Sequence, residues 1–205
     1  MSANSCWQCG QSVDGQLFCA ACHSLQPPPA NYYSLFAVPR RLDLNTGDLQ
    51  KRFYELSREL HPDRFMRKSE REREYSLEAS SILNDAYRAL KNPVTRAEYV
   101  LKQEGFDIGE QRSKNVPPEL LEEVFELNET LEEMRGGDES ARPQLEEARQ
   151  NFTGMLDDVD RQLEDLFRAW DANNDRAGLE KIRGALNRRK YIQNLVNEVI
   201  DSLEN

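Results

Sequence analysis

Four cysteines near the N-terminus carry the clearest chemical signal in the chain. Cys6, Cys9, Cys19 and Cys22 form the pattern C-x2-C-x9-C-x2-C, and they are the 4 cysteines of the 205-residue sequence. Each C-x2-C pair can form a tight turn that aims two thiolates at one point, so the two pairs together supply four sulfur ligands for a tetrahedral metal ion. Because four thiolates close the coordination shell, the pattern predicts a structural zinc ion and not a catalytic one.

The same sulfurs have alternative uses. A pair of disulfides requires an oxidising compartment, and the N-terminus lacks the basic segment and apolar stretch of a secretory signal. A redox-active C-x-x-C motif would accompany a βαβ pattern, which is absent. A rubredoxin-like iron site is a third alternative. With four sulfurs available, we expect the adjoining His23 to be a bystander, while Trp7 and Phe18 could cover the metal.

A second candidate site is the tripeptide His61-Pro62-Asp63. Pro62 disfavours helix at His61, so the tripeptide should form a loop between helices, where His61 and Asp63 offer directional hydrogen bonds. Neighbouring bases add a positive surface that can steer an acidic partner, and these are Lys51, Arg52, Arg58, Arg64 and Lys68. The alternative is a simple connecting turn in which Asp63 caps the next helix and the bases form a solvated helix face.

Helices on both sides must hold this loop in place. Leu49, Phe53, Leu56 and Leu60 recur at helical spacing and predict an amphipathic helix that begins at Asn45 or Thr46. After the loop, a long helix should run to about residue 90. Its predicted core positions are Leu77, Ser80 or Ser81, Leu83 or Asn84, Tyr87 and Leu90. Short helices are expected before and after this pair, the first capped by Asn31 and ended by Pro39.

The last part of the chain predicts three amphipathic helices. After Pro117-Pro118, an apolar stripe runs at helical spacing through Leu120, Val124, Leu127, Leu131 and Met134. Gly136-Gly137 ends this helix, and similar stripes follow from 145 to 170 and from 179 to 203. Three such helices joined by short loops predict an antiparallel bundle.

The predicted helix after Pro117-Pro118 carries a second apolar stripe that is not part of the core stripe. Leu121 and Phe125 lie about 100° around the helix from the core stripe, and Glu126, Glu129 and Glu133 follow them. If exposed, an apolar patch framed by carboxylates suggests a binding site for a partner protein. The alternative is that both residues pack against a neighbouring helix or the preceding helical region.

Charge divides the chain into three parts. Residues 1–30, 31–105 and 106–205 carry net charges of −1, +2 and −11, which together give the net charge of −10. This charge argues against nucleic acid as the main partner, because phosphate binding needs a positive surface. No apolar run approaches the roughly 18 residues of a membrane span, and no transit peptide is evident. We therefore expect a cytoplasmic protein, or a mitochondrial-matrix one if a eukaryotic form has been processed.

The residues around the tripeptide resemble a J domain. The resemblance rests on a basic helix, the His-Pro-Asp motif, a long helix ending in Ala-Tyr-Arg-Ala-Leu, and the sequence Asn-Pro-x-x-Arg-Ala-x-Tyr. It implies that the loop docks on a heat-shock ATPase chaperone of the DnaK type and stimulates ATP hydrolysis there.

From residue 31 to 205 the chain resembles the HscB (Hsc20) iron–sulfur co-chaperone family, whose second marker here is Leu-Leu-Glu-Glu-x-x-Glu-Leu-x-Glu-x-Leu. The resemblance implies that the C-terminal bundle binds the iron–sulfur scaffold protein IscU. It carries the scaffold-binding role onto Leu121, Phe125, Glu126, Glu129, Glu133 and Tyr191. The four-cysteine module resembles that of animal members of the family.

The sequence therefore predicts a mainly α-helical chain, and the resemblance implies that it acts as a co-chaperone. The expected parts are a zinc module at 1–26, a proline linker at 27–30, a J domain at 31–105, a connector at 106–117 and a three-helix antiparallel bundle at 118–205. The resemblance implies an activator of a DnaK- or HscA-type chaperone and not an enzyme. The chain itself has no phosphate-binding Gly-x4-Gly-Lys-Ser/Thr loop and no Gly-x-Ser-x-Gly elbow. The alternative is a general J-domain co-chaperone with another client.

Overall fold

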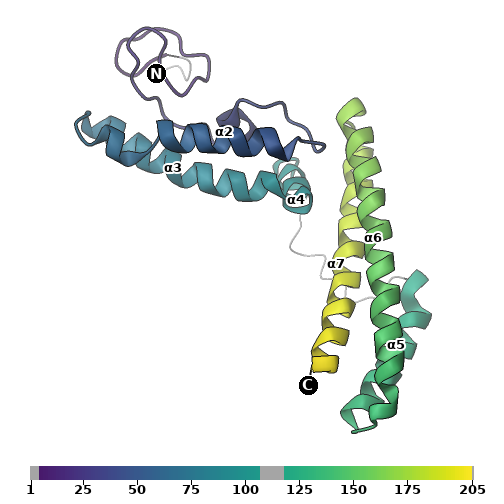
Figure 1. Cartoon of the computed structure of the whole chain (residues 1–205). Helices are drawn as coiled ribbons and strands as arrows, with labels where there is room; N and C mark the ends of the chain where they lie inside the picture. Colours follow the sequence, from purple (N-terminus) through teal and green to yellow (C-terminus); the bar gives the residue numbers. More distant parts are fainter. Residues whose placement is uncertain (1–4, 107–117, 205) are drawn as a thin grey trace. The chain divides into compact units, whose positions relative to one another are not determined.

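The computed structural model describes residues 5–106 and 118–204, with the side chain of Glu119 excepted. The chain divides into two compact units, Met1–Tyr99 and Val100–Asn205, and each is described by itself (Figure 1). Of the predicted connector at 106–117, only Phe106 lies within the described residues. No helix in the described ranges is long and apolar enough to cross a membrane.

The N-terminal module consists of two equivalent turns, one for each C-x2-C pair. In each turn, the residue after the second cysteine donates its backbone N–H to the carbonyl of the first cysteine, from Gly10 to Cys6 at 2.9 Å and from His23 to Cys19 at 2.8 Å. Gly10 and His23 both have a positive φ, of 77° and 56°. Glycine adopts this left-handed conformation at little cost, which suits it to the first turn. The two turns thereby point their cysteines toward a common centre.

The helices of the first unit begin and end close to where the sequence predicts. Asn31 and Asn45 cap the first two through their side-chain oxygens, as expected. The first helix ends at Phe36 because Ala37 adopts a left-handed conformation, before Pro39 is reached. The elements are α1 (Tyr32–Phe36), α2 (Thr46–Glu59), the 3-10 helix η1 (Pro62–Phe65), α3 (Glu70–Lys91) and α4 (Pro93–Gln103), whose last residues from Val100 belong to the second unit.

The prediction that Leu77 belongs to the core is wrong. Its side chain is 61% exposed, whereas α3 buries a stripe of mostly small residues, Ser76, Ala79, Leu83, Ala86 and Leu90. Small side chains let the backbone of α2 approach α3 closely, and Leu77 lies about 100° around the helix from Ser76. The alternative in which Asp63 caps the next helix is wrong, because Ser69 and Glu72 form the capping box at the start of α3.

The second unit is the predicted antiparallel bundle. Two long helices pair along their length, joined by a tight turn in which Asn174 is left-handed, and a shorter helix packs on both (Figure 1). The elements are η2 (Pro118–Leu120), α5 (Leu121–Arg135), η3 (Glu139–Ala141), α6 (Arg142–Asn173) and α7 (Arg176–Glu204). The core contains Phe152, Val159, Leu163, Trp170, Ile182, Ile192 and Val199. A half-buried ion pair, Arg189 Nε to Asp160 Oδ1 at 2.5 Å, ties α7 to α6.

Candidate metal and partner-binding sites

The four cysteine sulfurs lie close enough together to bind one metal ion. All four are free thiols, and their Sγ atoms lie within 4.8 Å of one another. Two pairs, Cys6–Cys22 and Cys9–Cys19, are each separated by 3.6 Å. A tetrahedral zinc site with Zn–S bonds near 2.3 Å places its sulfurs about 3.8 Å apart. The cluster therefore fits a four-thiolate site of this kind, and His23 is not part of it.

The surroundings of the cluster shift the pKa values of Cys6, Cys22 and Cys9 in different directions. Burial acts to raise the pKa of the Cys6 thiol, but hydrogen bonds from Ser24 and from backbone amides outweigh it and lower that pKa to about 5. A hydrogen bond from Ser24 likewise lowers the pKa of Cys22. At Cys9 a backbone hydrogen bond acts in the same direction, but burial and the three neighbouring thiols raise the pKa to about 12. A metal cation at the centre removes this repulsion between sulfurs and favours four thiolates.

Trp7, suggested by the sequence as a cover for the metal, packs against α3. Its Nε1–H donates to the carbonyl of Leu25 at 2.7 Å. The ring meets Tyr75 edge-on at a centroid distance of 6.3 Å, and the guanidinium carbon of Arg71 lies 5.1 Å from the centroid of the indole. Trp7 therefore anchors the four-cysteine module on α3.

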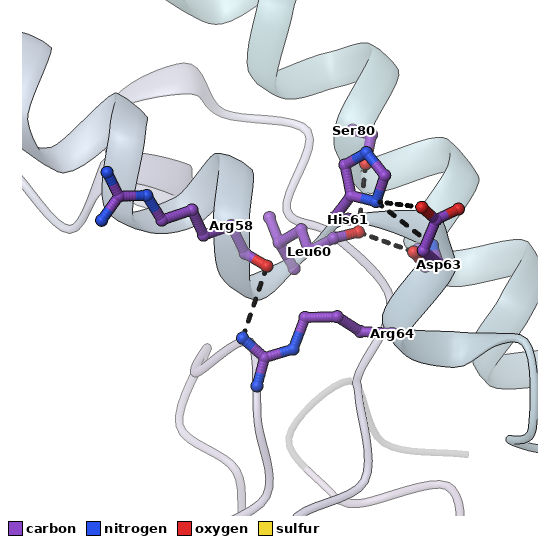
Figure 2. Close-up of polar contacts among 7 residues, drawn as sticks. Arg58, Leu60, His61, Asp63, Arg64 and Ser80 are labelled. Atoms are coloured by element: carbon purple, nitrogen blue, oxygen red, sulfur yellow. Dashed lines mark hydrogen bonds and ion pairs between the residues drawn. The ribbon is translucent and has the colours of Figure 1, made fainter.

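The His61-Pro62-Asp63 tripeptide forms an exposed turn between α2 and α3. The backbone N–H of Asp63 donates to Nδ1 of His61 at 3.3 Å, so this bond needs the imidazole tautomer that keeps its proton on Nε2. The Asp63 carboxylate lies 3.6 Å from the same Nδ1. Arg64 turns back and donates to the carbonyl of Arg58 at 3.5 Å (Figure 2). The structure thus brings three predicted polar side chains together at the end of α2.

The carbonyl of Leu60 fixes the base of this turn. Leu60 ends α2, and its carbonyl accepts from the hydroxyl of Ser76 at 2.6 Å. It also accepts from the hydroxyl of Ser80 at 3.1 Å (Figure 2). Both serines belong to α3, so α3 holds the C-terminal end of α2. Sequence reasoning placed Ser80 in the core but missed this role. The available signal was a pair of serines four residues apart on the buried face of α3.

The predicted basic residues lie at different distances from the turn. Lys51 and Arg58 are seven residues apart on α2 and share a face, while Lys68 lies in the segment before α3. Lys51 contacts Asp48 at 3.6 Å, and Arg52 contacts the Glu55 carboxylate at 3.0 Å. The positive surface is therefore interrupted by carboxylates. Met66, a residue that the sequence reasoning passed over, adds an exposed apolar side chain beside the turn.

In the bundle, Leu121 and Phe125 project away from the core. Their side chains are 55% and 63% exposed, which makes them the exposed large apolar residues in the described part of the second unit. Val124, Leu127 and Leu131 of the same helix are buried. The alternative that Leu121 and Phe125 pack into a neighbouring helix of the bundle is therefore wrong.

The predicted carboxylates lie on the other flank of α5. Glu126, Glu129 and Glu133 line a groove of about 800 Å³ between α5 and α6, whose second wall includes Glu147 and Asp158. Each residue turns the helix by about 100°, so these three carboxylates lie next to Leu121 and Phe125 around the helix. Both sets face away from the core. The apolar and acidic residues therefore form adjoining strips on the outer surface of one helix.

Tyr191 lies on the side of α7 that approaches α5. It precedes Glu198 by seven residues and so shares its face, and Glu198 accepts from Arg135 of α5 at 3.4 Å. The Tyr191 side chain is half-buried, and burial, followed by the charge of Glu198, raises the pKa of its phenol. Tyr191 therefore lies on the face of α7 that contacts α5 through Glu198 and Arg135.

Comparison with known proteins identifies the family. A DnaJ domain model matches residues 31–99, and a model of the HSCB C-terminal oligomerisation domain matches residues 116–200. The iron–sulfur cluster co-chaperone protein HscB of Mus musculus is 30% identical over 203 residues, which covers 96% of this chain and 82% of the relative. The chain belongs to the HscB co-chaperone family. A co-chaperone protein HscB homolog of Aliivibrio fischeri is 35% identical over 174 residues, covering 85% of this chain and 96% of that one.

Solved HscB structures share the fold. The crystal structure of human co-chaperone protein HscB matches with a TM-score of 0.73 and 29% identity, covering 95% of this chain and 96% of that chain. Chaperone HscB from Vibrio cholerae matches with a TM-score of 0.59 and 30% identity over 83% of this chain and 96% of that one. The predicted fold class, a J domain followed by a helical bundle with a four-cysteine N-terminus, is therefore confirmed as that of HscB.

Proposed function

We propose that this HscB-family chain delivers an IscU-type iron–sulfur scaffold to a DnaK- or HscA-type chaperone and stimulates the chaperone's ATP hydrolysis. The observation that carries the proposal is one chain with two exposed surfaces of different chemistry. One is the His-Pro-Asp turn held by α3, and the other is the apolar and acidic outer surface of α5. In this role the chain is an activator of another protein's ATPase and not an enzyme.

The chaperone arm is the turn at His61, Pro62 and Asp63 with its surrounding bases. The exposed imidazole and carboxylate supply directional hydrogen bonds, and Pro62 fixes the backbone that carries them. Lys51, Arg52, Arg58, Arg64 and Lys68 then contribute mainly to the rate of association, because exposed charges steer encounter more than they add affinity.

The scaffold arm is the outer surface of α5 together with Tyr191. Leu121 and Phe125 supply apolar area that is removed from water only when a partner covers them. Glu126, Glu129 and Glu133 border this area with negative charge and select a partner with complementary positive charge.

Both arms on one chain make an adaptor. A scaffold bound to the bundle of residues 118–205 is held near any chaperone bound to the J domain of residues 31–105, so its effective concentration at the chaperone rises without new contacts. The chaperone's ATP hydrolysis then traps the client.

The four cysteines hold a structural zinc ion in this proposal. The sulfur separations and the hydrogen bonds to Cys6 and Cys22 suit a closed four-thiolate shell, which stabilises the module and leaves no position for substrate. Metal analysis of the purified chain tests this point. One zinc per chain supports the proposal, whereas bound iron with a visible absorption spectrum would favour the rubredoxin-like alternative.

Steady-state ATPase measurements test the co-chaperone proposal. The rate of a DnaK- or HscA-type chaperone is measured with and without this protein, and with and without an IscU-type scaffold. We expect the protein and the scaffold to act synergistically. His61→Gln should abolish stimulation without unfolding the chain, because the side chain is exposed, and His23→Gln is the matched control at the other histidine.

Changes in the bundle separate the two arms. Leu121→Ser with Phe125→Ser should abolish scaffold binding and synergy while basal stimulation of the chaperone persists, and Ala169→Ser, at an exposed position of α6, is the control. Stimulation without synergy by the unmodified protein would instead favour a general J-domain co-chaperone with another client. Retention of scaffold binding by the double variant would contradict the role assigned to α5.

A further inference from the structure

Two polar side chains outside the cysteine motif are buried against the sulfur cluster. Ser24 and Gln26 are each only 2% exposed. The hydroxyl of Ser24 lies 3.0 Å from Sγ of Cys22 and 3.3 Å from Sγ of Cys6. The amide nitrogen of Gln26 lies within hydrogen-bond distance of three acceptors, at 3.3 Å from Sγ of Cys6 and at 2.9 Å from both the hydroxyl and the carbonyl oxygen of Ser24.

The hydrogens available decide how these contacts are shared. A serine hydroxyl has one hydrogen to share between the two sulfurs, and the contact with Cys22 is the shorter of the two. The Gln26 amide has two hydrogens for its three acceptors, so the hydrogen that reaches Cys6 is shared with an oxygen of Ser24. The backbone N–H of Gln8 donates to Cys6 as well, at 3.4 Å. Cys6 and Cys22, the two sulfurs 3.6 Å apart, are thus each supplied with a side-chain donor that lies outside the C-x2-C motifs.

We propose that Ser24 and Gln26 are positioning residues of the metal centre, which hold Cys22 and Cys6 as oriented thiolates and set how tightly the metal is retained. This inference rests on the metal site of the proposed function. Donors to a ligand atom fix its orientation and spread its charge, and the loss of such a group typically weakens metal affinity about 10- to 100-fold. Burial strengthens the effect because water cannot replace the missing donor.

The same three-residue segment connects the metal centre to α3. Between Ser24 and Gln26, the carbonyl of Leu25 accepts the indole N–H of Trp7, and Oε1 of Gln26 accepts the backbone N–H of Trp7 at 3.4 Å. Trp7 in turn packs on Tyr75 of α3. Ser24 and Gln26 therefore support the sulfurs from a backbone that is itself fixed on the J domain.

Metal retention by the full-length chain tests the proposal. The wild type, Ser24→Ala and Gln26→Leu are loaded with Zn²⁺, and zinc loss to a colorimetric chelator is measured. We expect each variant to bind zinc about 10- to 100-fold more weakly than the wild type. Ser12→Ala is the matched control, because its hydroxyl bonds to the carboxylate of Asp14 at 2.7 Å in the same module, and it should behave as wild type.

Cobalt substitution provides a readout that a change in packing alone would not move. Hydrogen bonds to a thiolate lower the energy of its lone pairs, so their removal should shift the sulfur-to-Co²⁺ charge-transfer band to longer wavelength in Ser24→Ala and in Gln26→Leu, but not in Ser12→Ala. An unshifted band together with unchanged zinc affinity in both variants would overturn the inference while leaving the metal site intact. A wild-type chain that binds no zinc would instead contradict the proposed metal site itself.

Discussion

The two serines that hold the Leu60 carbonyl should behave as an energetically coupled pair. Ser76 and Ser80 donate to the same oxygen at 2.6 and 3.1 Å, so either one satisfies part of its bonding capacity when the other is absent. A double-mutant cycle compares Ser76→Ala, Ser80→Ala and the double variant. It measures whether the end of α2 needs at least one of the two hydroxyl groups.

The expected magnitude follows from this shared acceptor. A typical hydrogen bond contributes about 1 kcal/mol net, so each single change should cost about that much while the other serine still donates. The double variant leaves a buried carbonyl without either hydroxyl, which costs about 1 kcal/mol or more beyond the sum. We therefore expect about 3 kcal/mol for the double variant and a coupling free energy of about 1 kcal/mol between Ser76 and Ser80.

Hydrogen exchange measured by mass spectrometry on peptides from α2 and α3 reports these free energies. Each kcal/mol of lost stability should speed the exchange of the affected amides about fivefold. Alanine also favours helix over serine by a few tenths of a kcal/mol, and Ser81→Ala, an exposed position on α3, measures that gain alone. Strict additivity of Ser76→Ala and Ser80→Ala would refute the reasoning, because it would show that the Leu60 carbonyl does not depend on the pair.

Three further predictions concern other contacts. Trp7→Ala should destabilise the first unit by about 2 kcal/mol in urea unfolding, because it removes an aromatic and a cation–π contact with α3; an unchanged midpoint would contradict that anchoring role. Burial, chiefly, raises the pKa of Tyr99, whose hydroxyl also accepts the backbone N–H of Tyr32 at 3.0 Å. Folding therefore favours the neutral phenol of Tyr99. The stability that this group contributes is present below about pH 10 and should be lost as pH rises through the raised pKa. The free energy of unfolding should therefore fall more steeply with pH in wild type than in Tyr99→Phe. The Arg189–Asp160 pair should show a coupling of about 1 kcal/mol at low salt and less at 1 M salt, and a value that rises with salt would rule out an ion pair.

Sequence pattern predicts those features of the molecule that depend on spacing along the chain. The C-x2-C pairs predict a four-sulfur cluster because each pair makes its own local turn. Helical periodicity places α2 and the helices of the bundle, and Asn31 and Asn45 act as caps because a cap needs only the next three backbone amides. Exposure of Leu121 and Phe125 agrees with the excess of apolar residues on α5, which one core cannot bury on every side.

Features that depend on distant segments were not predictable in this way. Periodicity predicts Leu77 in the core because leucine is more apolar than the serine and alanines that α3 buries. Which face of α3 is buried depends on its packing against α2, which sequence pattern does not reveal. The contact of Ser76 with Leu60 spans 16 residues, and that of Trp7 with Tyr75 joins two modules. The capping box of Ser69 and Glu72 could have been predicted, since its signature is local.

The contacts that end α2 determine when the His-Pro-Asp turn can form as the chain folds. The Leu60 carbonyl is held by side chains that follow it by 16 and 20 residues, so local sequence alone cannot complete the His-Pro-Asp turn. During synthesis, the turn can take its final shape only after residue 80 has emerged and α3 has packed on α2. A partner that binds this turn through its geometry, as proposed above for the chaperone, would distinguish a finished helical hairpin from a nascent or partly unfolded one.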